Sequence, residues 1–124
     1  MTVRALTLLT KREGMSRQDF REHWRTVHAP IGARFPHLIA YHQHLTIDTV
    51  ARGAMPAPEA TVDGISELVF ATRADLDAAL ASPEAAEAAA DAANFMTQMR
   101  MYIVESTTVV DDGQTKLPLV DRDD

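Results

Sequence analysis

The hydrophobic positions along the chain alternate between the period of a strand and that of a helix. Residues 3–10 are rich in leucine and β-branched side chains and end at a polar group, which predicts a strand followed by a loop. Ser16 and Asp19 then have the spacing of a helix-capping pair, and five side chains recur on one face of the helix that follows. They are Phe20, Trp24, Val27, His28 and Ile31. Because a residue that precedes proline disfavours the helical conformation, Pro30 predicts that this helix ends close to His28.

Three more strands and a second helical region follow. Alternating apolar and polar side chains predict the strands, which cover residues 38–48, 64–72 and 97–110. An alanine-rich stretch predicts helices over residues 74–81 and 83–94, the second with Ser82 as N-cap and Pro83 in its first turn. The order βαββαβ defines a ferredoxin-like α+β fold, in which helices cover one face of a four-stranded antiparallel sheet.

The second face of this sheet also carries apolar side chains. Along the strand over residues 64–72, Leu68 and Phe70 point to one face, whereas Ile65 and Val69 point to the other. A monomer would expose a large apolar patch on the face that has no helices. We therefore expect a homodimer in which two sheets pack face to face, a dimeric α/β barrel.

The chain is interpreted as one domain over residues 1–112, followed by an acidic tail over residues 113–124 that is frayed or used in the dimer contact. Residues 49–63 hold glycine and prolines among small side chains. So long a connection inside a compact domain usually has a role. We expect a flexible loop that covers the cleft between the first helix and the sheet.

Composition narrows the possible functions. The chain has 124 residues, 46% of them hydrophobic, which is enough for one domain. It has no cysteine, which excludes disulfides, thiolate metal ligands and a cysteine nucleophile. The net charge is −6 without a basic cluster, which argues against nucleic acid as a partner. No stretch reaches the roughly 20 apolar residues of a membrane span. We expect a cytoplasmic protein whose partners are a small organic molecule and a second copy of the chain.

Several short motifs are distributed over residues 3–110. In the first half they are Lys11-Arg12-Glu13-Gly14-Met15-Ser16, Phe20, Trp24, His28-Ala29-Pro30 and Pro36-His37-Leu38 before Tyr41 and Gln43. In the second half they are Asp63-Gly64, Glu67-Leu68, Phe70 and Ser82-Pro83-Glu84. Together these motifs resemble the EthD family of the dimeric α/β barrel proteins. Founding members of that family accompany the degradation of an ether, and relatives include lactone isomerases, polyketide cyclases, dehydratases and cofactor-independent oxygenases. Fold transfers better than reaction in such a resemblance.

His28 and Glu67 are candidate catalytic residues. An imidazole one turn beyond Trp24 on the apolar helix face is suited to proton transfer near neutral pH, and His28 stands where the family has its histidine. It could instead pack against the last carbonyls of the helix. Glu67 lies among apolar neighbours, where desolvation would disfavour its charged form and make it a second acid or base. Its alternative is an ion pair, for which Arg100 is the expected partner.

The remaining candidates are ligand contacts. Tyr41 is a third catalytic candidate because it shares a strand face with Gln43, and the two could orient a substrate carbonyl or hydroxyl; a tyrosine that satisfies one structural hydrogen bond is the alternative. Phe20 and Trp24 could form an aromatic wall for a ring-shaped ligand, or could be ordinary core. Phe70 completes the set of expected substrate contacts.

The histidines outside the first helix face give no metal site. His42 and His44 are two apart on the other face of their strand, a spacing that suits one metal ion, but no third ligand has a matching position. His23 and His37 are expected to face solvent or a loop. We predict neither a metal nor a bound cofactor.

The main hypothesis is an enzyme that transfers protons on a cyclic, lactone or polyketide-like molecule, as an isomerase, a lyase (dehydratase) or a cyclase. A non-catalytic dimer that binds a hydrophobic ligand, or accompanies a catabolic or biosynthetic pathway, is the alternative. A purely structural dimer ranks third. A cavity that reaches His28 would favour the enzyme, whereas a closed core around His28 would not.

Overall fold

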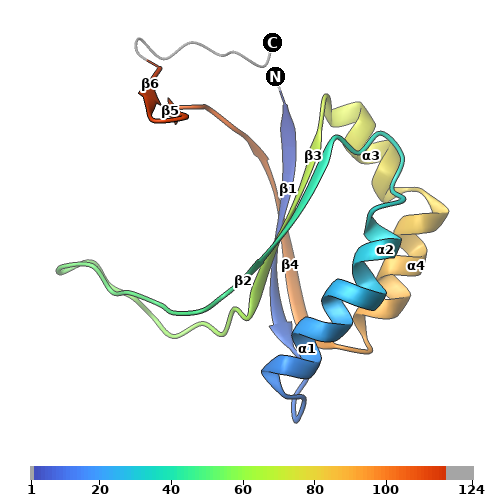
Figure 1. The fold of residues 1–124 in the computed structure, drawn as a ribbon, viewed down its shortest axis with the longest axis horizontal. Helices are drawn as coiled ribbons and strands as arrows, with labels where there is room; N and C mark the ends of the chain where they lie inside the picture. The colour runs from blue at the N-terminus through green and yellow to red at the C-terminus, as the bar shows by residue number, and fades with distance from the viewer. Residues whose placement is uncertain (1, 117–124) are drawn as a thin grey trace.

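The computed structural model describes residues 2–116. Its centre is a four-stranded antiparallel sheet in the order β2-β3-β1-β4, with all helices on one face (Figure 1). The strands are β1 (Val3–Lys11), β2 (Ala40–Leu45), β3 (Gly64–Phe70) and β4 (Met96–Glu105). The structure therefore confirms the ferredoxin-like α+β fold. The first three strands lie close to the ranges that the pattern predicts, whereas β4 ends at Glu105, before the predicted end at residue 110.

The central strand β1 shows why the two faces of the sheet differ. Val3, Ala5, Thr7 and Leu9 alternate with more exposed residues and are buried beneath the helices. Leu6, on the opposite face, stands between Glu67 of β3 and Tyr102 of β4. Because side chains alternate along each strand, paired residues share a face, and the register assigns every strand residue to the helix side or to the open side.

The first helical region is longer than the sequence predicts. It consists of α1 (Arg17–His23), a π-helical turn η1 (Trp24–His28) and α2 (Ala29–Gly32), so the prediction that the helix ends near His28 is wrong. In the π turn the Ala29 amide donates to the carbonyl of Trp24, five residues back. This wider turn moves aside the carbonyl that the ring of Pro30 would meet in an α-helix, and the helix continues. The extra residue also turns Val27 outward, where it is 45% exposed, although the pattern placed it on the buried face.

The second helical region comprises α3 (Arg73–Leu80) and α4 (Pro83–Ala92). The Ser82 hydroxyl accepts a hydrogen bond from the amide of Ala85 at 3.2 Å, as the capping prediction required. The fully buried side chains lie between these helices, α1 and the sheet, in two clusters centred on Phe70 and on Trp24. Among residues 2–116, no helix is long and apolar enough to cross a membrane.

The β2–β3 loop extends away from the helices on the open side of the sheet (Figure 1). Its base is fixed by hydrogen bonds from the Thr46 amide to the Asp63 carbonyl (3.0 Å) and from the Asp63 amide to the Leu9 carbonyl (2.8 Å), which continue the strand direction past the sheet. The prediction that residues 49–63 cover the cleft between helix and sheet is therefore wrong within one chain.

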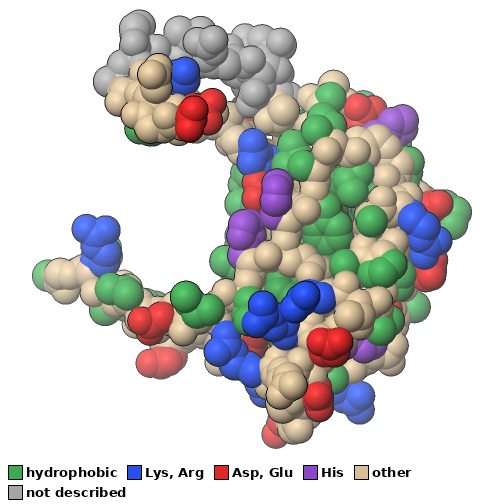
Figure 2. All heavy atoms as spheres, viewed as in Figure 1, with side chains coloured by type: hydrophobic (Ala, Val, Ile, Leu, Met, Phe, Trp, Pro, Cys, Tyr) green, Lys and Arg blue, Asp and Glu red, His purple; other side chains and the backbone are tan. Residues whose placement is uncertain are grey.

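A small hairpin follows β4, formed by β5 (Val110–Asp111) and β6 (Gln114–Thr115). It was not predicted, because the sequence after residue 110 reads as a polar tail. The hairpin and the β2–β3 loop leave a hollow over the open face of the sheet, on which histidine and hydrophobic side chains gather (Figure 2). The remainder of the expected acidic tail, residues 117–124, lies outside the described residues.

Candidate functional site

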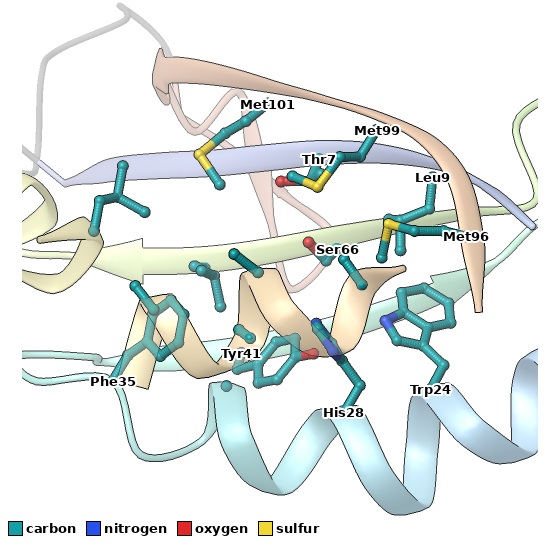
Figure 3. A pocket seen from close by; sticks show the side chains of 17 residues that line it. Thr7, Leu9, Trp24, His28, Phe35, Tyr41, Ser66, Met96, Met99 and Met101 are labelled. Atoms are coloured by element: carbon teal, nitrogen blue, oxygen red, sulfur yellow. The ribbon is translucent and has the colours of Figure 1, made fainter. Parts of the chain in front are cut away.

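A cavity of about 260 Å³ lies between the helices and the sheet (Figure 3). Its walls are mainly apolar and include Leu9, Leu68, Met96, Met99, Met101 and the small side chains Ala85, Ala88, Ala89 and Ala92 of α4. The polar side chains on its walls are those of Thr7, Trp24, His28, Tyr41 and Ser66. The cavity thus reaches His28, which is the condition that favours a functional role for this histidine.

His28 is held by Asp91, a residue that the sequence analysis missed. The Nδ1 atom of His28 lies 2.8 Å from Oδ2 of Asp91, which belongs to α4, and both side chains are largely buried. An ionised carboxylate can only accept hydrogen bonds, so Nδ1 carries a proton, and a ring with this single proton has Nε2 as its acceptor. The ring of His28 projects into the cavity (Figure 3).

Asp91 also binds two further donors. Its Oδ1 atom is 2.9 Å from Nε2 of His23 and 3.0 Å from the side-chain nitrogen Nδ2 of Asn94. Burial raises the pKa of Asp91, but the hydrogen bonds from Asn94, His28 and His23 together outweigh it, and the pKa lies below its ordinary value. Asp91 is therefore a carboxylate at neutral pH and fixes the orientation of both histidines.

The expectation that His23 faces solvent or a loop is wrong. Its ring stacks on Phe95 with centroids 4.9 Å apart, and His28 approaches the same phenylalanine at 4.9 Å. A signal for this cluster was present in the sequence: Ala85, Ala88 and Ala92 are spaced as one helix face, and Asp91 follows Ala88 by three residues on the same side. An acidic residue on the inner face of an alanine-rich helix points to a buried partner. His37 lies in the turn before β2 and is mostly exposed, as expected.

Tyr41 and Gln43 share the helix-facing side of β2, as predicted. The Gln43 side-chain amide donates to the Tyr41 hydroxyl at 2.8 Å and to the backbone carbonyl of Trp24 at 3.0 Å, which ties the strand to the π turn. Burial raises the pKa of Tyr41, an effect that the nearby side chains of Gln43 and Trp24 only partly offset. The phenol is therefore neutral at physiological pH and has a hydrogen to donate into the cavity.

The predicted aromatic contacts separate into two groups. Trp24 lines the cavity and its ring lies against Gly64 of β3, where a Cβ atom would approach the ring to 2.6 Å. Phe20 and Phe70 are fully buried in the two core clusters and are not part of the cavity wall, so their expected place at the substrate is wrong. Their position follows from burial, because large apolar rings beneath a helix remove the most apolar surface from water when they pack in the core.

Glu67 lies on the other face of the sheet from His28, and its expected place in the same cleft is wrong. It directly precedes the helix-facing Leu68, and neighbouring side chains on a strand point to opposite faces, so Glu67 points to the open face, where it pairs with Arg4. His44 lies 3.2 Å and His42 3.7 Å from its Oε1 atom. The hydrogen bond from Arg4 is the main cause that lowers the pKa of Glu67, against a smaller raising effect of burial.

Glu67 thus forms an ion pair, as the alternative interpretation predicted, but its partner is Arg4. Arg100, the partner that the sequence suggested, lies over the ring of Tyr102 at 5.7 Å instead. The rings of His42 and His44 stack with centroids 6.2 Å apart. Within residues 2–116, no group of three or more histidine, cysteine, aspartate or glutamate side chains is arranged to hold a metal ion.

Comparisons with known proteins agree with this architecture. Residues 12–98 match the model of the EthD domain family. The structure is similar to an EthD family protein from Bacillus halodurans, at 22% identity and a TM-score of 0.70, over 86% of this chain and 99% of that chain. It is also similar to a dimeric ferredoxin-like protein of unknown function from Thermobifida fusca (16% identity, TM-score 0.63, 84% and 90% covered).

A third similar structure is SnoaB, a cofactor-independent oxygenase from Streptomyces nogalater, at 14% identity and a TM-score of 0.58, over 94% of this chain and 97% of that chain. At such identities the likeness concerns the fold. The comparison with curated proteins finds no match.

Proposed function

The chain belongs to the EthD domain family, and from this premise we propose that it is a small-molecule enzyme in which His28 transfers protons without a bound cofactor. The observation that carries the proposal is the hydrogen bond between His28 and Asp91 at the wall of a largely apolar cavity. A histidine whose second nitrogen is held by a carboxylate, next to space for a ligand, has the arrangement of a general base.

The proposed reaction moves a proton between two positions of a carbonyl compound or lactone. Nε2 of His28 takes a proton from the carbon next to the carbonyl, and the electron pair of that C–H bond moves into an enolate. The Asp91 carboxylate stabilises the imidazolium that forms. The imidazolium then returns the proton to another carbon for isomerisation, or to a departing oxygen for elimination of water. Tyr41, as a neutral phenol, is the proposed donor to the enolate oxygen.

We also propose that the working form is a homodimer through the open face of the sheet. This face carries the apolar side chains Leu6, Leu8, Ile65 and Val69 together with the Arg4–Glu67 pair. It is hollowed (Figure 2), and among the described residues no helix lies over it (Figure 1). Similar structures from Bacteroides fragilis and Thermobifida fusca are described as dimeric. We propose that Glu67 belongs to this dimer contact and takes no part in the reaction.

A ligand-binding protein without catalysis is the second candidate, because most of the cavity wall is apolar. The two are separated by one experiment in two steps. Cyclic ketones, lactones and phenols are first screened for thermal stabilisation, since a ligand of the native state raises the melting temperature. For each ketone or lactone found, exchange of the hydrogens next to its carbonyl with heavy water is then followed by NMR.

The enzyme proposal expects exchange faster than in buffer with the wild type and loss of this acceleration in His28→Gln. Ligands that stabilise the protein but show no accelerated exchange would favour the binding protein. SnoaB, whose structure is similar, is a cofactor-independent enzyme, although the reaction of SnoaB is an oxygenation.

A further inference from the structure

The indole N–H of Trp24 is buried without an acceptor. The residue is only 1% exposed, and among the described residues no acceptor lies at hydrogen-bonding distance and angle from its Nε1 atom. Gln43 binds the backbone carbonyl of Trp24, which leaves the indole unsatisfied. Buried polar groups of native proteins are nearly always hydrogen-bonded, and one that is not needs a specific cause.

The unsatisfied N–H faces the cavity. Trp24 is part of the wall, and its indole nitrogen points into the space that the His28 ring and the Tyr41 hydroxyl also face (Figure 3). The indole lies close enough to the Tyr41 hydroxyl to lower the Tyr41 pKa as a hydrogen-bond donor does, but the distance and angle fall short of a full hydrogen bond, so a ligand oxygen can compete for this N–H. Two neutral donors and one histidine therefore converge on the same space.

We propose that Trp24 is a ligand-binding residue whose Nε1–H donates to an oxygen of the bound molecule beside His28. This inference rests on the proposed function of the cavity and names the kind of molecule that it takes. The ligand is compact, mainly apolar, and carries one carbonyl, enol or phenol oxygen at the end that meets Trp24 and Tyr41.

The size and charge of the cavity limit the ligand. An apolar cavity of about 150 Å³ holds benzene, so the present cavity of about 260 Å³ suits one ring with a short substituent or two small fused rings. No lysine or arginine is part of its wall, so a second, charged group on the ligand would be buried without a partner. In the proposed reaction, charge that develops on the ligand oxygen meets the donors of Trp24 and Tyr41, which stabilise it.

The test uses the fact that the chain contains one tryptophan, so its indole gives one N–H signal in the NMR spectrum of nitrogen-labelled protein. The probes are indanone, which has a ring ketone, and indane, which has the same carbon skeleton without the oxygen. Indanone is expected to shift the indole proton downfield in a saturable manner, as a new hydrogen bond does. Indane is expected to leave the proton without a downfield shift.

Trp24→Phe removes the N–H and keeps an aromatic ring. It is expected to weaken indanone binding about 3- to 10-fold, the usual effect of one neutral hydrogen bond, and to leave indane binding nearly unchanged. Ser66→Ala removes a different polar group from the cavity wall. It is the control for the loss of any polar group, as opposed to the loss of the indole N–H. If Trp24→Phe does not fold, the indole shift of the wild type still decides, because it needs no variant.

Equal shifts with indanone and indane, an unchanged indole signal while indanone saturates the cavity, or no binding of indanone at millimolar concentration would each overturn the inference. The outcome is separable from that of the proposed enzyme. An indole shift that persists in His28→Gln, together with absent hydrogen exchange in the wild type, would retain Trp24 as a ligand-binding residue and remove the catalytic function.

Discussion

His28 and Asp91 are 63 residues apart in the sequence and joined by a hydrogen bond of 2.8 Å between Nδ1 and Oδ2. The bond connects the end of the π turn with the last turn of α4, two elements from the two halves of the fold. It is possible because the alanines of α4 let this helix come close to the first helical region. The same contact that fixes the packing of α4 also fixes the ring that faces the cavity.

The first prediction concerns the chemistry of His28. Replacing it with Gln keeps polarity and approximate size but removes the imidazole that accepts and returns the proton. We expect turnover, or hydrogen exchange on any ligand found by the screen, to fall by about two to four orders of magnitude. Unfolding by urea is expected to change much less, because Gln can still donate to Asp91.

His37→Gln is the matched control, since His37 is mostly exposed and does not line the cavity. It should leave activity unchanged. A folded His28→Gln protein with nearly normal turnover would remove His28 from the mechanism and leave the binding protein as the better interpretation.

The second prediction concerns pH and Asp91. Its pKa is lower in the folded than in the unfolded chain, so the unfolded chain binds more protons between the two values. The contribution of Asp91 to stability is therefore complete above its ordinary pKa and is lost as pH falls through the lower, folded value. Asp91→Asn should lower the free energy of unfolding by about 1–3 kcal/mol at neutral pH, where a buried acceptor of several hydrogen bonds is lost.

The difference between wild type and Asp91→Asn should shrink as the pH is lowered below about 5. Urea unfolding at a series of pH values measures it. Asp77→Asn is the control, because Asp77 is an exposed member of an i,i+4 pair with Arg73 and should matter by less than about 0.5 kcal/mol. A difference between wild type and Asp91→Asn that stays constant down to strongly acidic pH would contradict the assigned pKa direction.

The strands and the fold could be predicted from the sequence because burial imposes a simple alternation on them. Val3, Ala5 and Leu9 point to the helices, and the period of two shows this directly. The EthD motifs then indicated the family, and the match of residues 12–98 to the model of the EthD domain confirms this assignment. Tyr41 and Gln43 were placed on one face by the same rule of alternation.

The candidate site could be predicted only in part, because contacts across the fold leave weak local signals. The π turn at Trp24–His28 depends on how the chain accommodates Pro30, and a helical wheel with a constant period does not contain it. The role of Asp91 could be predicted only with the knowledge that α4 lies against His23 and His28. Glu67 was predicted to be catalytic because its apolar sequence neighbours suggested burial. Its actual partner, Arg4, lies on another strand.

The third prediction concerns the contact between Gly64 and Trp24. A Cβ atom at position 64 would lie 2.6 and 2.7 Å from two ring carbons of Trp24, which is closer than van der Waals contact. Gly64→Ala should therefore destabilise the protein by about 1–3 kcal/mol through overpacking. The double variant Gly64→Ala/Trp24→Phe should be less destabilised than the sum of its single changes, because the shorter ring makes room for the methyl group.

Urea unfolding of the wild type, both single variants and the double variant measures this coupling. Additive effects would mean that the ring of Trp24 moves away from the added methyl group at little cost. The position of the indole N–H in the cavity would then be less fixed than the packing against Gly64 indicates.

The fourth prediction concerns the proposed homodimer. Ile65, the second residue of β3, stands on the open face beside Leu8 of β1. We expect a dimeric mass for the wild type in sedimentation equilibrium at micromolar concentration, and a monomeric mass for Ile65→Arg. Val27→Arg is the control, because Val27 is an exposed apolar residue on the helical side and should not affect the mass.

The effect of Ile65→Arg should be large because symmetry doubles it. In a two-fold dimer each copy brings the same charge to the same contact, so two arginines would be buried close to one another. One uncompensated buried charge costs about 3–5 kcal/mol, which is already more than a hundredfold in the dissociation constant. Circular dichroism must show that the variant is folded, so that loss of the dimer is not loss of the fold. A monomeric wild type, or an Ile65→Arg protein that remains dimeric, would exclude the open face as the contact and leave its apolar residues without an explanation.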